Sequence, residues 1–228
     1  MSNFLPLVLF ALLFVGGHVV LSSLPVRDRL VAVLGERVYI PLYATLATAS
    51  LTGLIWAWAR APFVELWPAP RALAWVPLVL MPLAFWLLVE GLSRTNPGAV
   101  YQAERPVATR PKGLFAVTRH PGMWGFALWA ASHLVVNGDL ASVVMIGAVL
   151  VLALGGSLHI DARRRAKLGA GWDEYARHSS WLPFLALAQG RSRLHLAELG
   201  WKRPLAALVL YAAMLHLHRL VIGVSPLP

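Results

Sequence analysis

Long apolar stretches separated by short polar segments dominate the pattern of this chain. An α-helix needs about 20 apolar residues to cross a hydrocarbon layer, and most of the stretches reach that length. The pattern therefore predicts an all-α, polytopic membrane bundle that forms one domain over residues 1–228. The predicted spans cover residues 4–23, 38–59, 72–91, 121–136, 140–160 and 204–223.

The fourth predicted span is the shortest. Its residues 121–136 rise only about 24 Å as a helix, less than the thickness of a typical hydrocarbon core of about 30 Å. Shelter by neighbouring helices or local thinning of the bilayer accommodates such a helix. Residues 161–203 form the most polar part, predicted as a helical extension of the fifth span followed by an amphipathic piece on the membrane surface.

Composition supports the membrane class. The chain is 58% hydrophobic with a mean hydropathy of +0.66, and only 13% of its residues are charged, about half the ~25% of a soluble domain. It has no cysteine, which excludes disulfides, thiolate metal sites and thiol catalysis. The net charge of +10 is interpreted as loop charge and contact with membrane lipid, so nucleic acid is not expected as a partner.

The basic residues fix an orientation. The first, third and fifth loops between the spans hold 17 of the 20 Lys and Arg residues. Because short cytoplasmic loops carry the excess of Lys and Arg, these loops are predicted to face the cytoplasm. Both termini then lie on the non-cytoplasmic side.

Four histidines lie within the predicted spans or near their ends: His18, His133, His216 and His218. An imidazole in lipid needs a partner, and the alternatives are a functional ligand or an interhelical hydrogen bond worth only about 0.6–2 kcal/mol. From the cytoplasmic face, His133 lies roughly 18 Å deep, His218 roughly 21 Å and His18 roughly 8 Å. Depth therefore favours His133 with His218 as a pair.

Two neutral imidazoles in a helical bundle suit a b-type haem, because they bind iron without burying an added charge. Two glycine pairs, Gly16-Gly17 and Gly155-Gly156, would let a flat macrocycle approach the helices. The same pairs also suit close packing between helices, and the sequence leaves both roles open.

A second group of polar residues lies at the predicted cytoplasmic face. Arg119 and His120 begin the fourth span, and Asp161 and Arg163 end the fifth. Because a short Asn-Gly-Asp turn joins these two spans, their cytoplasmic ends should meet, with Tyr175 close by. An anionic ligand or lipid headgroup fits there, and so does simple ion pairing that anchors the loops.

These residues carry a resemblance. The stretches GGHVVLSS (16–23), RHPGMWGFALWAASHLVVNGDLAS (119–142), IDARRR (160–165) and GVSPL (223–227) resemble the NnrU family. The resemblance implies a bacterial inner-membrane protein linked to denitrification and to nitrite or nitric oxide metabolism.

That family is similar to 15-cis-zeta-carotene isomerase, an integral membrane enzyme that uses haem b. Its haem-binding histidines lie in the first span and thirteen residues after an Arg-His-Pro histidine. By resemblance these positions are His18 and His133. The resemblance thus implies His18 with His133 as the ligands, and His218 stays as the rival ligand from depth.

A wider resemblance connects RHPGMWG and WDEYARHSSWLP to isoprenylcysteine carboxyl methyltransferases. Here Met123 replaces an aromatic residue, and Asp161-Ala162-Arg163 replaces the usual pair of glutamates. The resemblance implies a shared fold, with S-adenosylmethionine chemistry as one possible activity.

The sequence therefore supports three functional hypotheses. The first is a haem-b redox or cis-trans isomerase-like protein, in which Arg119, His120 and Asp161 position a haem propionate or a substrate. Its ligand would be a hydrophobic polyene or a small gas. The second is a non-enzymatic membrane accessory factor for denitrification, and the third is a membrane methyltransferase. No catalytic residue is assigned.

Overall fold

A computed structural model describes residues 3–94 and 110–228 of the chain. The third loop between the predicted spans, residues 92–120, therefore lies partly outside the described residues. The structure is 75% helical, and its described residues form helices joined by turns and short extended segments. The prediction of an all-α membrane bundle is confirmed.

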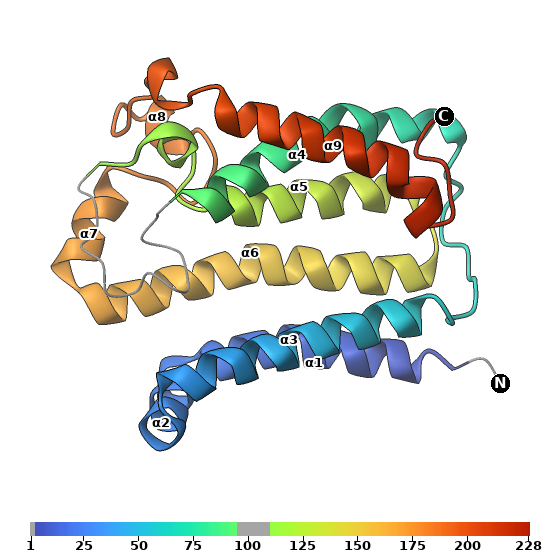
Figure 1. Ribbon diagram of the computed structural model, residues 1–228, viewed down its shortest axis with the longest axis horizontal. Helices are drawn as coiled ribbons and strands as arrows, with labels where there is room; N and C mark the ends of the chain where they lie inside the picture. The colour runs from blue at the N-terminus through green and yellow to red at the C-terminus, as the bar shows by residue number, and fades with distance from the viewer. Residues whose placement is uncertain (1–2, 95–109) are drawn as a thin grey trace.

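The described helices follow one another from the N-terminus to the C-terminus (Figure 1). Their bounds are α1 Leu5–Ser22, α2 Leu24–Leu34, α3 Glu36–Trp58, η1 Arg71–Ala74, α4 Trp75–Ser93, η3 Gly113–Ala116, α5 Pro121–Val136, α6 Leu140–Leu168, α7 Ala170–Arg177, α8 Leu185–Ala188, η4 Leu196–Glu198 and α9 Lys202–Val221.

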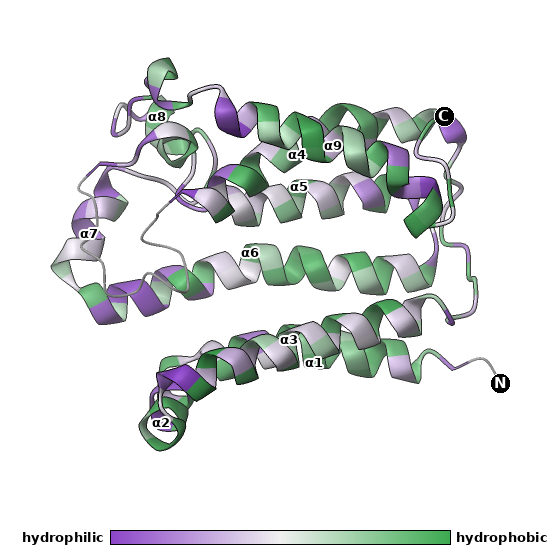
Figure 2. Cartoon of the chain, in the orientation of Figure 1, coloured by the Kyte–Doolittle hydropathy of each residue, from purple (hydrophilic) through white to green (hydrophobic). Residues whose placement is uncertain are grey.

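Five helical segments of the described chain are long and apolar enough to cross a membrane: α1, α3, η1 with α4, α6 and α9. In the most apolar 18-residue stretch of each segment, only 6–28% is buried inside the protein. Figure 2 shows hydrophobic residues along these helices and polar residues mainly at one end. Most apolar side chains thus face outward, as expected where lipid covers them.

Helix α5 packs with these five segments in the bundle but is shorter. It has 16 residues, with the predicted bounds. It packs lengthwise between α4 and α6, so its neighbours shelter much of its surface (Figure 1). This packing accounts for the short helix, because a helix covered by protein needs less apolar length to match the bilayer.

Both chain termini lie at the same end of the bundle (Figure 1). The opposite end carries α2, α7 and α8 and is called the polybasic end below. It is the end predicted to face the cytoplasm. The first loop between the predicted spans, residues 24–37, is instead mostly helical, because Pro25 occupies the first turn of α2 and starts a helix there.

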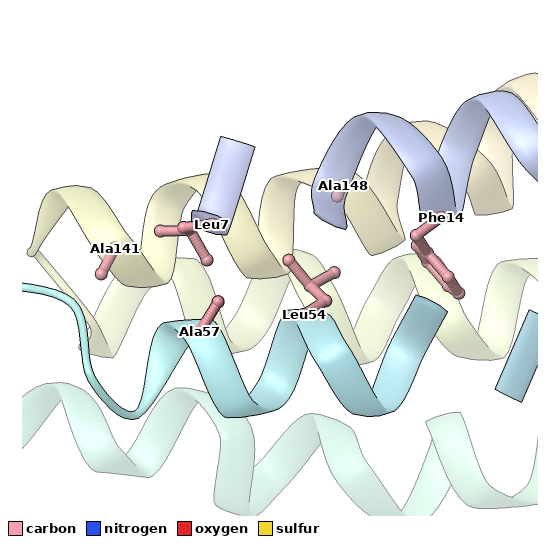
Figure 3. Packing of buried hydrophobic residues seen from close by; sticks show 6 residues of the cluster. All are labelled: Leu7, Phe14, Leu54, Ala57, Ala141 and Ala148. Atoms are coloured by element: carbon pink, nitrogen blue, oxygen red, sulfur yellow. The ribbon is translucent and has the colours of Figure 1, made fainter. Parts of the chain in front are cut away.

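Buried apolar side chains join α1, α3 and α6 (Figure 3). Leu7 is 1% exposed and Leu54 is fully buried, and the small side chains of Ala141 and Ala148 on α6 face them. Along the bundle, α1 packs on α3 and α6, α5 packs on α6 and α4, and α9 packs on α4. Helix α6 therefore connects the α1–α3 pair to the α4–α5–α9 group.

The turn between α5 and α6 fixes their antiparallel pairing at the other end. The Asp139 carboxylate accepts a 2.9 Å hydrogen bond from the Ser142 backbone N–H and caps α6. The Gly138 carbonyl accepts hydrogen bonds from the backbone N–H groups of Leu66 and Trp67. A Cβ atom on Gly138 would lie 2.0 Å from the Trp67 carbonyl oxygen, so this close approach requires glycine.

Glycines also bring α4 and α5 together. A Cβ atom on Gly91 would lie 2.3 Å from the backbone nitrogen of Gly122. In contrast, Gly16, Gly17 and Gly155 have no atom within 4 Å of such a Cβ atom, so close helix packing within the described chain does not explain them.

We predict that Gly91→Ala destabilises the protein by about 1–3 kcal/mol, because the new methyl group would force α4 and α5 apart. Unfolding of the detergent-solubilised protein by SDS titration measures the change. Gly155→Ala is the matched control, since open space surrounds that position. Equal stability of the two variants would contradict the observed packing.

Candidate functional site

The polybasic end holds a compact ion-pair network between α5 and α6. Asp161 uses both carboxylate oxygens: Oδ2 accepts a 2.8 Å hydrogen bond from Arg119 Nε, and Oδ1 lies 2.6 Å from His120 Nε2. Arg119 also donates to Ser179 Oγ at 3.3 Å. These four residues are called the Asp161 network below. The predicted meeting of Arg119 and His120 with Asp161 is thus observed in the structure.

Local sequence explains this geometry. Pro121 starts α5 in the first helical turn, which turns the two preceding residues back toward α6. Helix α6 has 29 residues and extends well beyond the apolar part, so Asp161 lies level with that start. The short turn at Asp139 makes the two helices antiparallel neighbours.

A strap from residues 179–184 closes the network from outside. Thr118 Oγ1 and Trp124 Nε1 both donate to the Trp181 carbonyl, at 2.8 and 2.9 Å. Trp181 Nε1 in turn donates to Ser157 Oγ on α6 at 2.6 Å. The conformation of the strap is thereby tied to both helices of the hairpin.

The exposed fractions of the side chains indicate which members of the Asp161 network a ligand could contact. The side chain of His120 is 3% exposed, that of Arg119 14% and that of Asp161 17%. Because a carboxylate only accepts, His120 Nε2 carries the proton of this hydrogen bond. Arg119 and Asp161 remain the members that a ligand could reach.

Tyr175 of α7 lies beside the network and is 2% exposed. Burial raises the pKa of its phenol far above the ordinary value, and the Asp161 charge raises it further while Arg119 opposes the change. Tyr175 is therefore a neutral phenol in the folded protein. Arg163, also predicted to join this group, lies within electrostatic range of Tyr39 and Tyr43 on α3 instead.

Three histidines of the spanning helices share one feature. The Nδ1 atom of each lies against a backbone carbonyl oxygen: His18 at 2.6 Å from Phe14 O, His133 at 2.8 Å from Trp129 O, and His218 at 2.8 Å from Val224 O. A carbonyl only accepts, so Nδ1 carries a proton, and in the neutral imidazole Nε2 is the atom with the lone pair. Metal-binding histidines are commonly held in this way.

Two of these histidines lie on helices of the same group: His133 on α5 is within electrostatic range of His218 on α9. His18 instead lies beside Tyr43 of α3, with ring centroids 5.8 Å apart.

His18 and His133 are not brought together. Helix α6 packs between the helices that carry them. Measured from the polybasic end, His18 lies about 6 Å along α1 and His133 about 18 Å along α5. No group of three or more His, Asp or Glu side chains in the described part of the chain has the geometry of a metal site.

Two buried polar groups were not expected from the sequence. Glu90 is fully buried and pairs with Arg94 at 2.5 Å and with Arg203 at 3.6 Å. Glu90 and Arg94 lie four residues apart, about one helical turn, and this spacing is the sequence signal that could have predicted their ion pair. His159 Nε2 is buried with no hydrogen-bond partner in the described residues. His159 lies at the end of the fifth predicted span, and it is not among the four histidines that the sequence singled out.

Comparison with known proteins agrees with the resemblance of the motifs. A family model described as NnrU protein matches residues 6–226. The chain belongs to the NnrU family. No solved structure matches this chain.

A curated relative is 15-cis-zeta-carotene isomerase, chloroplastic, from Zea mays. It is 25% identical over 206 residues, which cover 85% of this chain and 53% of the relative. The chain thus spans about half the length of the relative that it matches.

We predict that Asp161→Asn lowers the free energy of unfolding by about 3 kcal/mol, because it leaves Arg119 and His120 without their shared anion. SDS titration in mixed micelles measures the loss. Asp173→Asn is the control: Asp173 pairs with Arg165, but both side chains are more than half exposed, so less than about 1 kcal/mol should be lost. A loss as small as that of the control would show that the network contributes little.

We also predict an alkaline effect from Tyr175. Above pH 10, the ordinary pKa of tyrosine, the unfolded chain releases the phenolic proton while the buried phenol keeps it. Stability from this group is therefore complete below that pH and declines as the pH rises. Tyr175→Phe should flatten the alkaline decline of stability measured between neutral and strongly alkaline pH. Identical slopes in the two proteins would rule this out.

Proposed function

We propose that this NnrU family member binds haem b within the membrane and has a redox or cis-trans isomerase-like activity. The observation that carries the proposal is the contact of Nδ1 with a backbone carbonyl oxygen in His18, His133 and His218, which leaves Nε2 of each ring as the atom that could bind a metal. When bound, the haem would supply an iron centre that changes oxidation state and ligation. The donor chemistry fits that group, because neutral imidazoles bind iron without burying charge.

His133 is the ligand on which both lines of argument agree. The resemblance to the isomerase implies His18 as its partner. Proximity favours His218, which lies within electrostatic range of His133. We propose His133 with His218 as the pair that needs the least movement of helices, with His18 as the alternative that the resemblance implies.

The Asp161 network is proposed to orient a substrate at the cytoplasmic entrance. His133 lies about 18 Å along α5 from its start at Pro121, and Arg119 directly precedes that start, so the two residues serve opposite ends of the helix. The positive end of the α5 dipole adds to the attraction for an anionic group. His120 holds Asp161 in place, and the neutral Tyr175 lines the same region.

A hydrophobic polyene is the proposed substrate class, since the relative is named as an isomerase of 15-cis-zeta-carotene. A small gas such as nitric oxide is the alternative ligand, which would connect the protein to denitrification as an enzyme or as an accessory factor. We further propose the bacterial inner membrane as its location, with the polybasic end in the cytoplasm and both termini outside it.

We predict that the full-length protein, expressed with ample haem and purified in detergent, shows the reduced-minus-oxidised absorbance spectrum of a b-type haem. His133→Ala should lose most of the bound haem, because it removes a ligand to iron. His218→Ala should also lose it if the proximity pair is right, and His18→Ala if the pair implied by resemblance is right.

His216→Ala is the matched control, because His216 lies on α9 two residues from His218 and is exposed. Haem content is measured by extraction as the pyridine complex. A wild-type protein without haem, or full haem in the His133 variant, would refute the proposal.

A further inference from the structure

A second group of polar side chains lies at the polybasic end, on the side of α6 that faces α1 and α3. The guanidinium of Arg27 lies 5.5 Å from the centre of the Tyr39 ring, and Tyr39 stacks on Tyr43 with centroids 6.1 Å apart. Arg163 of α6 lies within electrostatic range of Arg27 and of both tyrosines. Arg27, Tyr39, Tyr43, His159 and Arg163 are called the Arg163 cluster below.

Two atoms of the cluster are buried without a hydrogen-bond partner in the described residues: Arg163 Nε and His159 Nε2. The two residues are four apart on α6 and so share one face of the helix. His159 also lies close to the backbone of Ser22 at the end of α1. Buried polar atoms are nearly always satisfied, and Arg163 Nε can only donate, so it calls for an acceptor from outside the chain.

The charges around the cluster point to an anion. Arg27 pairs with Glu36 at 2.6 Å, and Asp28 is shared between Arg27 at 3.6 Å and Lys167 at 3.7 Å. Glu36 and Asp28, the described acidic residues that form ion pairs there, are thus already paired with Arg27 and Lys167. Arg163 adds a further positive charge, with Arg164 beside it only 4% exposed.

The position of the cluster indicates where the anion comes from. It lies where α1 and α6 leave the apolar part of the bundle, the level at which lipid headgroups meet a spanning helix. Val19 and Val20 of α1 and Leu158 of α6 expose apolar side chains next to it. No atom lies within 4 Å of a Cβ atom built on Gly155, which leaves space along α6 for an acyl chain.

We propose that the Arg163 cluster is a binding site for the phosphate of an anionic phospholipid, whose acyl chains lie along α1 and α6. Arg163 Nε donates to the phosphate, Arg27 contributes charge, and Tyr39 and Tyr43 form the wall on the α3 side. Basic pockets between spanning helices at the cytoplasmic face commonly bind such headgroups. The site is separate from the Asp161 network and from His133, and it does not depend on haem.

The test uses the full-length protein in detergent with added phosphatidylglycerol, and native mass spectrometry and the thermal midpoint report binding. The wild type should bind the lipid and gain thermal stability. Arg163→Met should weaken binding about tenfold or more, because it removes a charge-assisted hydrogen bond. Arg163→Lys should fall between them, since it keeps the charge but loses the Nε donor. Arg165→Met is the control, as Arg165 is largely exposed and pairs with Asp173.

Phosphatidylcholine and inorganic phosphate complete the test. The proposal expects weaker binding of phosphatidylcholine and no stabilisation by inorganic phosphate at the same concentration. Equal binding of phosphatidylglycerol to the wild type and Arg163→Met, equal binding of the two lipids, or full stabilisation by phosphate alone would each overturn it. Because these readouts do not involve haem, a protein that fails to bind haem can still pass this test.

Discussion

The pairing of Asp161 with Arg119 and His120 is the interaction on which the centre of the bundle depends. One carboxylate on α6 satisfies two cationic or donor groups at the start of α5, at 2.8 and 2.6 Å. A charge at the edge of a bilayer is costly unless it is paired, so this pairing fixes how α5 and α6 slide relative to each other. The register then sets the level of every residue on α5, including His133. The capped turn at Asp139 holds the same register at the other end.

The two halves of the bundle carry different chemistry. The α4–α5–α9 group contains His133 and His218, the proposed haem ligands, and Glu90 with its two arginines. The α1–α3 pair contains His18 and the aromatic residues that continue to Arg27. Because α6 contacts both halves, its polar end contributes Asp161 to one group and Arg163 to the other. Positions only two residues apart on a helix face different directions, which explains how one helix end supplies two sites.

Much of the fold could be predicted from the sequence, because apolar runs of spanning length leave few alternatives to a helical bundle. The bounds of α5 and its meeting with α6 followed from Pro121 and the Asn-Gly-Asp turn. Helix α2 was missed because its charged residues resemble a loop when only hydropathy is considered. The separation of Arg163 from Asp161, and of His18 from His133, depends on how α6 is rotated between its neighbours. Rotation is set by side-chain packing, such as Leu7 and Leu54 against Ala141 and Ala148, and one-dimensional hydropathy does not encode it.

The electron paramagnetic resonance spectrum of the oxidised, full-length protein purified with haem b tests the central proposal most directly. Two imidazoles on one ferric iron give a low-spin signal, and we predict that signal for the wild type. In His133→Ala, any haem that remains should be high-spin, because the iron would have lost one imidazole ligand. A low-spin signal that persists unchanged in His133→Ala would contradict the assignment of His133 as a haem ligand.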